Sequence, residues 1–269
     1  MADITGATSI LLMLADPVSH IRGTILINDA LAALGLDAVI VPIHVTPTDL
    51  ETFLASARRM QNVAGLGITI PHKIAACVLV DELTPVARRM GATNFVRRNA
   101  DGTLTGTNTD GAGFMEGLRV NGFDATGKRA LLVGTGGVGR AIAFGLAEAG
   151  LARLDVMNRD RGKAEALATE VQAAFPSCRV DLADASSLKA ADLLVNGTSL
   201  GMKTSDPLPL ELASLTDRTT VAEVVVQPAM TRLLSDAAAR GCPIIAGAEM
   251  LKPQPAIVAE FFGLLRRDG

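Results

Sequence analysis

A lysine follows an apolar run that has the length of one buried β-strand. The run is Gly65–Ile70, and only Pro71 and His72 separate it from Lys73. Because burying an unpaired ammonium costs several kcal/mol, Lys73 either extends into water or has a chemical task. A lysine beside a substrate hydroxyl can act as an acid–base group once its site lowers its pKa from about 10.4. Asp110, in the segment GTNTDGAG, is the candidate partner; it would raise that pKa, and a purely structural ion pair is the alternative.

A glycine-rich turn with the spacing G-x-G-x-x-G lies between an apolar run and a segment of helical period. Gly134 allows the tight turn, Gly136 lets the backbone approach a pyrophosphate, and Gly139 lets the helix pack closely on the strand. The helix that opens near Gly137 would supply N–H donors and a partial positive charge to the phosphates. The motif predicts a dinucleotide-binding unit, and a glycine-rich turn without a ligand is the alternative.

The next expected strand ends in the segment LDVMNRDRGK, which decides the choice of cofactor. A unit that binds NAD places an acidic residue here, roughly 20 residues past the first glycine, to bind the ribose 2′-hydroxyl. This chain has Asn158 instead, and the basic residues that follow it, which suit a 2′-phosphate, are Arg159, Arg161 and Lys163. Asp160 lies among them and weakens the argument, so a solvated helix start is the alternative. We expect NADP as the cofactor.

The composition excludes several classes of protein. The net charge of −3 provides no basic field for a nucleic acid or an anionic membrane, so we expect a small-molecule partner. The N-terminal apolar run SILLMLAD is too short to span a membrane. The absence of tyrosine excludes reductases that use tyrosine as the proton donor, and no cysteine or histidine lies at metal-ligand spacing from another. The three cysteines are far apart in the sequence and predict reduced thiols in the cytoplasm.

Apolar runs alternate with segments of helical period along most of the chain, which is typical of parallel sheets with crossover helices. The alternation breaks at residues 93–111, where two short runs around Asn-Ala-Asp-Gly predict a β-hairpin. We therefore predict an α/β fold of two domains: an N-terminal α/β substrate-binding domain over 1–108 and a Rossmann-type, doubly wound dinucleotide-binding domain over 109–246. A final helix over about 249–265, in the segment 247–269, is assigned to the first domain, with the second as the alternative.

Three polar segments, GITIPHK, GATNF and GTNTDG, could converge on a cleft between the two domains. Together with NRDRGKAEALA, VNGTSLGM and GAEMLKPQ, they resemble the motifs of the shikimate dehydrogenase family, in the same order and along essentially the whole chain. The resemblance implies a reductase of aromatic amino acid biosynthesis that binds NADP on its second domain and a hydroxylated carbocyclic acid in the cleft. The sequence allows a homodimer but does not specify the oligomeric state.

The resemblance also implies roles for individual residues. Lys73 would pass the proton of the reacting hydroxyl while hydride moves to or from the nicotinamide, and Asp110 would hold that hydroxyl and the ammonium. The polar residues implied to line the substrate pocket are Thr69, Asn94 and Gln254. The residues implied to lie over the nicotinamide end of the cofactor are Asn196, Thr198, Ser199, Gly201 and Met202.

The sequence departs from the family pattern at the end of the pocket that would bind the substrate carboxylate. The two serines that grip the carboxylate in the family fall on Ile21 and Gly23, and the tyrosine that helps them falls on Val226. The asparagine of the motif N-V-T falls on Gly67. Arg22, between the two lost serines, would either bind an acid group or be a surface arginine.

Two classes of function follow. The first is an NADP-dependent oxidoreductase that interconverts a CH–OH group and a ketone on shikimate, which it uses poorly, or on a related polyol acid. The alternative is a non-catalytic dinucleotide-binding or regulatory protein whose substrate site has decayed and which need not retain Lys73. Methyl transfer with an adenosyl cofactor is disfavoured by the basic residues that follow Asn158.

Overall fold

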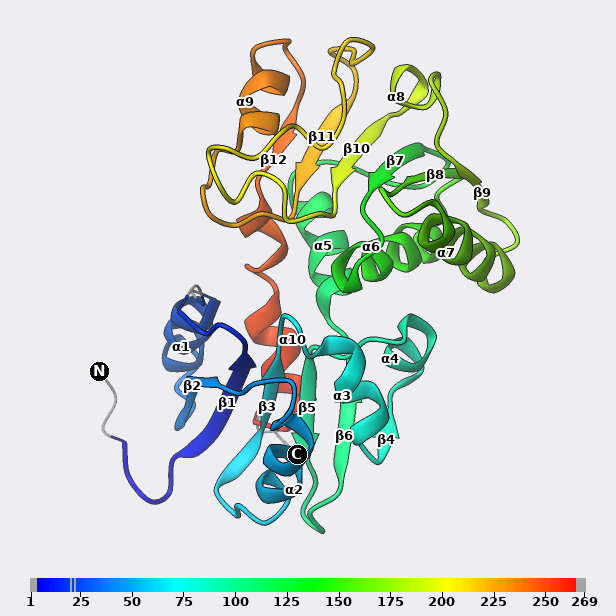
Figure 1. Cartoon of the computed structure of the whole chain (residues 1–269). Helices are drawn as coiled ribbons and strands as arrows, with labels where there is room; N and C mark the ends of the chain where they lie inside the picture. Colours follow the sequence, from blue (N-terminus) through cyan, green and yellow to red (C-terminus); the bar gives the residue numbers. More distant parts are fainter. Residues whose placement is uncertain (1–3, 20, 22, 265–269) are drawn as a thin grey trace. The chain divides into compact units, whose positions relative to one another are not determined.

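The chain folds into two compact α/β units, shown in Figure 1 as a computed structural model that describes residues 4–19, 21 and 23–264. The first unit takes in the described residues of Met1–Thr109 and Pro253–Gly269. The second unit is Asp110–Lys252. Each unit has its own six-stranded sheet.

The first unit has a mixed sheet with the strand order β2-β1-β3-β5-β6-β4. The strands β2, β1 and β3 are parallel, and β5 runs antiparallel to β3 and pairs with β6 as a hairpin, which confirms the predicted hairpin. The strands are β1 (Ser9–Ala15), β2 (Ala38–His44), β3 (Val63–Ile68), β4 (Glu82–Leu83), β5 (Phe95–Arg98) and β6 (Leu104–Thr107). The helices are α1 (Gly23–Ala33), α2 (Leu50–Ala57), α3 (Lys73–Leu79), α4 (Pro85–Met90) and α10 (Gln254–Phe261).

Strand β1 forms the centre of this unit because both of its faces are apolar. Leu11 and Met13 pack in one core cluster, which also contains residues of α1 and α10. Leu12 and Leu14 alternate with them and pack in a second cluster with residues of α2 and α3. A strand buried on both faces is typical of a parallel sheet covered by helices, so the continuous run of apolar residues predicts β1 correctly.

The second unit has a fully parallel sheet with the order β12-β11-β10-β7-β8-β9. The chain builds outward from β7 through β8 to β9 and then returns to the other side of β7, which makes a topological switch point between β7 and β10. The strands are β7 (Arg129–Val133), β8 (Arg153–Met157), β9 (Arg179–Leu182), β10 (Leu193–Asn196), β11 (Thr220–Glu223) and β12 (Ile244–Ile245). The helices are α5 (Asp110–Val120), α6 (Gly137–Glu148), α7 (Arg161–Ala174), α8 (Ser187–Ala190), α9 (Arg232–Ala238) and the 3-10 helix η1 (Gly247–Met250). The predicted α/β fold with a doubly wound dinucleotide-binding unit is confirmed.

The predicted bounds of the final helix are wrong. The long helix expected over 249–265 is divided into η1 and α10, and the described part of α10 ends at Phe261. Pro253 lies between the two helices, and a proline lacks the N–H that would continue the helix and disfavours helical backbone in the residue before it. Helix α5 begins at Asp110, where a carboxylate in the first turn favours a helix start.

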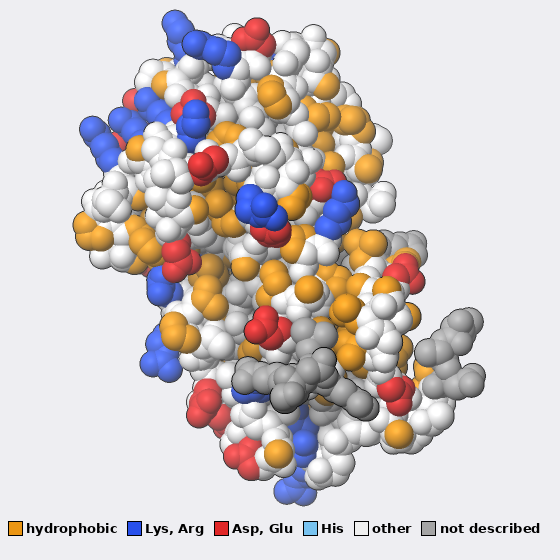
Figure 2. Space-filling view, turned by 180° about the vertical axis from the view of Figure 1, so that it is seen from behind, with side chains coloured by type: hydrophobic (Ala, Val, Ile, Leu, Met, Phe, Trp, Pro, Cys, Tyr) orange, Lys and Arg blue, Asp and Glu red, His pale blue; other side chains and the backbone are white. Residues whose placement is uncertain are grey.

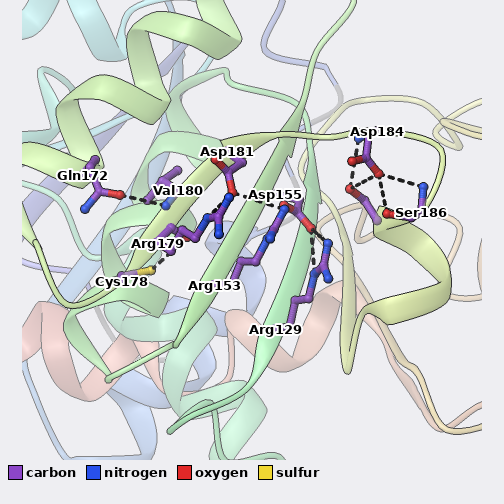
Figure 3. A network of polar contacts seen from close by, with 11 residues as sticks. Arg129, Arg153, Asp155, Gln172, Cys178, Arg179, Val180, Asp181, Asp184 and Ser186 are labelled. Carbon is purple, nitrogen blue, oxygen red and sulfur yellow. Dashed lines mark hydrogen bonds and ion pairs between the residues drawn. The ribbon is translucent and has the colours of Figure 1, made fainter.

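A ladder of charged side chains joins the first residues of β7, β8 and β9 (Figure 3). Arg129, Arg153 and Arg179 lie in register on the three strands. Asp155, with no exposed side chain, accepts hydrogen bonds from Arg129 Nη2 at 2.6 Å and Arg153 Nε at 2.9 Å. Asp181 lies 3.2 Å from Arg153 Nη2 and 2.7 Å from Arg179 Nε. The ladder is at the amino end of the strands, opposite the edge that carries the glycine-rich turn.

None of the helices in the described part of the chain is long and apolar enough to cross a membrane. On the face shown in Figure 2, basic and acidic side chains lie near one another instead of forming one large field of a single sign. This distribution agrees with the small net charge and with a small-molecule partner.

Candidate active site

Lys73 is the first residue of α3, just past the carboxyl end of β3, and its side chain is half-buried. The turn that leads to it is fixed on both sides. Thr69 N donates to Leu14 O at 3.1 Å, and His72 N donates to Thr69 O at 2.8 Å. The imidazole of His72, which is 1% exposed, lies with Nε2 2.8 Å from Val45 O. The buried histidine therefore anchors the turn, and Lys73 leaves it from a defined position.

Three buried polar side chains from three different segments form a hydrogen-bonded chain in the same unit. Asn94 Nδ2 donates to Thr109 Oγ1 at 3.0 Å, and Thr109 N donates to Asn94 Oδ1 at 2.9 Å. The Thr109 hydroxyl donates to Gln254 Oε1 at 2.5 Å. Asn94 precedes β5, Thr109 follows β6 and Gln254 opens α10, so residues that are 145 positions apart meet.

Backbone hydrogen bonds join this chain of polar groups to the lysine turn. Ile68 N donates to Asn94 O at 2.7 Å, and Thr93 N donates to Lys73 O at 2.9 Å. The structure thus brings Thr69, Lys73, Asn94 and Gln254, four of the predicted site residues, to one edge of the first sheet. An ammonium, two amides and hydroxyl groups at one edge can bind and orient a polyhydroxylated ligand.

Asp110 is 5% exposed and opens α5 as the first residue of the second unit. Its carboxylate at a helix start is stabilised by the partial positive charge there. The pairing of Asp110 with Lys73 stays a prediction, because the two residues belong to different units. Arg22 lies outside the described residues.

In the first unit, the described positions that depart from the family pattern have no polar side chain; they are Ile21, Gly23 and Gly67. Ile21 packs against the core cluster that contains Leu11 and Met13. Gly23 has open space where a Cβ would stand. At Gly67 a Cβ would lie 2.5 Å from Met13 Cε and 2.7 Å from Met13 Sδ, so the methionine fills that space. Val226, on the second unit, is half-buried.

The glycine-rich turn has the geometry that a pyrophosphate requires. Gly134 has φ +102°, a left-handed conformation that favours glycine, and Gly136 is the N-cap of α6. A Cβ at Gly136 would meet nothing within 4 Å, which leaves the helix start open to a ligand. A Cβ at Gly139 would collide with the carbonyl oxygen of Gly134, so the turn and the helix need a glycine there. Open N–H donors at Gly137 and beyond fit the phosphates of a dinucleotide.

The segment after β8 presents basic side chains, as the sequence predicts. Asp160 is the N-cap of α7 and accepts a hydrogen bond from Lys163 N at 3.3 Å, which gives this aspartate a structural role. Arg161 Nε lies 2.9 Å from Glu165 Oε1, and Lys163 Nζ lies 3.9 Å from Asp160 Oδ2. Arg159 is exposed and forms no ion pair within the described part of the chain. Arg159 and Lys163 are therefore more available for a 2′-phosphate than Arg161.

The loop after β10 is held by Asn196 together with Glu223, a residue that the sequence motifs do not include. Asn196 Nδ2 donates to Glu223 Oε1 at 2.8 Å, and Asn196 Oδ1 accepts from Thr198 N at 3.1 Å and Thr198 Oγ1 at 2.7 Å. Ser199 and Met202 are exposed on this loop. The one sequence signal for Glu223 is a single carboxylate inside the apolar run TVAEVVV.

Comparison with known proteins agrees with these two units. Residues 13–96 match the shikimate dehydrogenase substrate binding domain, and residues 118–204 match shikimate/quinate 5-dehydrogenase. A protein of Paramagnetospirillum magneticum named shikimate dehydrogenase (NADP(+)) is 42% identical over 241 residues, which is 88% of this chain and 86% of that protein.

Two solved structures extend the comparison over nearly the whole chain. Shikimate 5-dehydrogenase of Thermus thermophilus in complex with NADP(H) and shikimate is 33% identical with a TM-score of 0.86, covering 97% of this chain and 95% of that chain. Ligand-free 5-ketofructose reductase of a Gluconobacter species is 32% identical with a TM-score of 0.86, covering 96% and 94%. With both family domains matched in chain order and a relative above 40% identity, this chain belongs to the shikimate dehydrogenase family.

Proposed function

We propose that this chain is an NADP-dependent oxidoreductase that interconverts a CH–OH group and a ketone on a polyhydroxylated ring of the shikimate type. The observation that carries the proposal is the edge of the first sheet at which Lys73, Asn94 and Gln254 meet, in a chain whose relative is named shikimate dehydrogenase (NADP(+)). A non-catalytic dinucleotide-binding protein would have no need for this edge.

In the proposed reaction, Lys73 takes the proton of the substrate hydroxyl during oxidation and returns it during reduction. Asn94 and Gln254 bind neighbouring hydroxyl groups, and Thr109 holds both amides in place through its own hydrogen bonds. Asp110 orients the reacting hydroxyl and the Lys73 ammonium. NADP, when bound, accepts or supplies the hydride.

The residues that would hold the cofactor fit NADP in two respects. The open helix start at Gly136 suits the pyrophosphate, and exposed Arg159 with Lys163 suits the 2′-phosphate. Asn158, whose side-chain amide donates to Asp160 O at 3.0 Å, provides no carboxylate to bind a free 2′-hydroxyl. These features support NADP over NAD.

A second candidate substrate class is an uncharged polyhydroxy ketone. It is favoured by the absence of hydrogen-bonding side chains at Ile21, Gly23 and Gly67, the positions that the family resemblance assigns to the carboxylate end. The structural relative 5-ketofructose reductase is named for a substrate of this kind, which has no carboxylate. We also propose a cytoplasmic location, supported by the free thiols of Cys77, Cys178 and Cys242.

One experiment tests the function and separates the substrate classes. The purified chain is assayed with shikimate and quinate plus NADP⁺, and with uncharged polyhydroxy ketones plus NADPH, each repeated with the NAD form. Turnover that is lost in Lys73→Ala supports the proposed reaction, and the better substrate identifies the class. Absence of turnover with every pair, together with retained NADPH binding, would instead support the non-catalytic alternative.

A further inference from the structure

A buried carboxylate lies at the carboxyl end of β11, outside the group of residues that the family motifs assign. Glu223 is the last residue of that strand and is 1% exposed. Its Oε1 accepts hydrogen bonds from Asn196 Nδ2 at 2.8 Å, Val224 N at 3.1 Å and Val225 N at 3.3 Å. Its Oε2 accepts from Thr231 Oγ1 at 3.0 Å. Four donors therefore hold the carboxylate in one position.

Through Asn196, this carboxylate controls the loop that follows β10. The amide nitrogen of Asn196 bridges Glu223 and Leu200 O, the latter at 2.9 Å, while its oxygen binds the backbone and hydroxyl of Thr198. The Thr198 hydroxyl in turn accepts from Leu200 N at 3.0 Å. The loop 197–200 is therefore held by the side chain of Asn196, and Glu223 orients that side chain.

The same loop packs directly on the glycine-rich turn. A Cβ at Gly134 would lie 2.7 Å from Thr198 Cγ2 and 2.9 Å from Gly197 C. A Cβ at Gly197 would lie 3.2 Å from Gly139 Cα. Because the loop after β10 and the glycine-rich turn are in such close contact, a shift of one requires a shift of the other.

The hydrogen bonds of Glu223 do not require a charged side chain. Among the described residues no lysine, arginine or histidine forms an ion pair with it, and its burial raises the pKa of the carboxyl above its ordinary value. A glutamine could make the same contacts: its oxygen could accept from Asn196 and the two backbone groups, and its nitrogen could donate to the Thr231 hydroxyl. A buried charge without a counterion in the chain costs stability, so its presence points to a partner outside the chain.

The position of β11 in the sheet indicates which part of a bound dinucleotide would lie near Glu223. In a doubly wound sheet the dinucleotide crosses the switch point, here between β7 and β10. Asn158 and the basic residues for the 2′-phosphate follow β8, on one side of the switch point, so a bound nicotinamide would lie on the other side, toward β10 and β11. Glu223 ends β11, two strand spacings, or roughly 10 Å, from β7.

We propose, on the basis of the proposed NADP-dependent function, that the Glu223 carboxylate is a positioning residue for the nicotinamide loop and a fixed negative charge that favours the cationic ring of NADP⁺ over the neutral ring of NADPH. The two roles are separable, because one depends on the length of the side chain and the other on its charge. Over a separation of roughly 10 Å in a partly solvated site, one charge changes a binding constant by about three- to tenfold.

The test measures dissociation constants for NADP⁺ and NADPH, by calorimetry because the chain contains no tryptophan. Measurements are made above neutral pH, because burial raises the pKa of the Glu223 carboxyl. Glu223→Gln keeps the hydrogen bonds and removes the charge, so NADP⁺ binding should weaken about three- to tenfold relative to NADPH binding. Glu223→Asp keeps the charge and shortens the side chain, so both cofactors should bind more weakly with their ratio unchanged.

A matched control comes from the same loop region. Asp206 is partly exposed and accepts hydrogen bonds from Gly201 N and Lys203 N, both at 3.0 Å, so Asp206→Asn removes a charge that water screens and should leave the ratio of the two constants unchanged.

An unchanged ratio in Glu223→Gln would overturn the proposed charge effect, and unchanged affinities in Glu223→Asp would overturn the positioning role. A wild-type chain that binds neither cofactor would contradict the proposed function itself, which is a different outcome. If Glu223→Gln does not fold, the Glu223→Asp measurement still decides the positioning role, and Asn196→Asp, which places a second charge against Glu223, should weaken both cofactors.

Discussion

Met13 occupies the space beside Gly67 that a larger residue at that position would fill. A Cβ at Gly67 would lie 2.5 Å from Met13 Cε, and Phe95 Cε1 would lie 3.4 Å away on the other side. Met13 and Gly67 lie on adjacent parallel strands in register, so their backbones are fixed relative to each other, whereas the end of the Met13 side chain can move. Met13 thus fills space at the position where the family resemblance places a polar side chain.

The Met13–Gly67 contact gives a prediction about stability. Gly67→Ala should lower the free energy of unfolding by about 1 kcal/mol, because the added methyl group overpacks the site and the flexible end of Met13 relieves only part of the contact. Combining it with Met13→Ala should cost less than the sum of the two single changes, since the shortened side chain makes room. Urea unfolding of the wild type, the two single variants and the double variant measures this coupling. Strict additivity would show that the methionine yields without cost.

Gly23→Ser should improve the use of shikimate. The structure has open space at Gly23, so a serine can enter there without disturbing the core, whereas Ile21→Ser would also remove apolar packing. A hydrogen bond to a charged group contributes roughly 1.5–3 kcal/mol, so kcat/KM for shikimate should rise by about tenfold or more. Steady-state kinetics with shikimate and with an uncharged polyhydroxy ketone provide the check. An equal gain for both substrates would contradict a role in binding the carboxylate.

Lys73→Ala should reduce turnover by about 10²–10⁴-fold, the usual contribution of general acid–base catalysis. Cofactor affinity should hardly change, because Lys73 lies in the first unit and the glycine-rich turn in the second. Lys128→Ala, which removes an exposed lysine of the second unit, is the control and should behave like the wild type. Turnover within a few-fold of wild type in Lys73→Ala would make the lysine structural.

NADP(H) should bind more tightly than NAD(H), and Arg159→Ala should remove much of the difference. The exposed guanidinium can make charge-assisted hydrogen bonds to the 2′-phosphate, so its loss should weaken NADP(H) by about tenfold or more while leaving NAD(H) unchanged. Arg161, held 2.9 Å from Glu165, should matter less, and Arg161→Ala is the matched comparison. Equal affinity of the wild type for both cofactors would refute the assignment.

The raised pKa of Glu223 predicts how stability depends on pH. Because burial raises this pKa above 4.5, the folded state binds a proton more readily than the unfolded state, and the stability contributed by the protonated carboxyl is lost as the pH rises through the folded pKa. Glu223→Gln should therefore gain stability relative to wild type as the pH rises from about 4.5 toward neutrality. Urea unfolding at several pH values tests this, and a difference that shrinks with rising pH would be the wrong sign.

The sequence predicts the elements well where a single local signal decides. The apolar run of β1, the turn residues of the β5–β6 hairpin and the glycines before α6 each predict their structure directly. The continuous helix over 249–265 is wrong because apolar periodicity alone takes no account of Pro253. Thr109 could not be assigned its linking role, since a contact with Gln254 across 145 residues depends on the tertiary fold. Glu223 is similar: its importance comes from Asn196 and Thr231, which only the folded sheet brings to it.

The arginine ladder has a consequence for how the second sheet finds its alignment. Arg129, Arg153 and Arg179 begin three adjacent strands, so like charges stand side by side, and Asp155 and Asp181 compensate them at the native register. A one-residue slip of β8 would turn Arg153 and Asp155 together to the opposite face of the sheet and would separate Asp155 from Arg129. Mispaired sheets are thus penalised electrostatically at the edge farthest from the cofactor turn. Because the ion pairs at the amino ends of the strands specify their register, the residues at the carboxyl ends are not needed for that purpose and can serve in ligand binding.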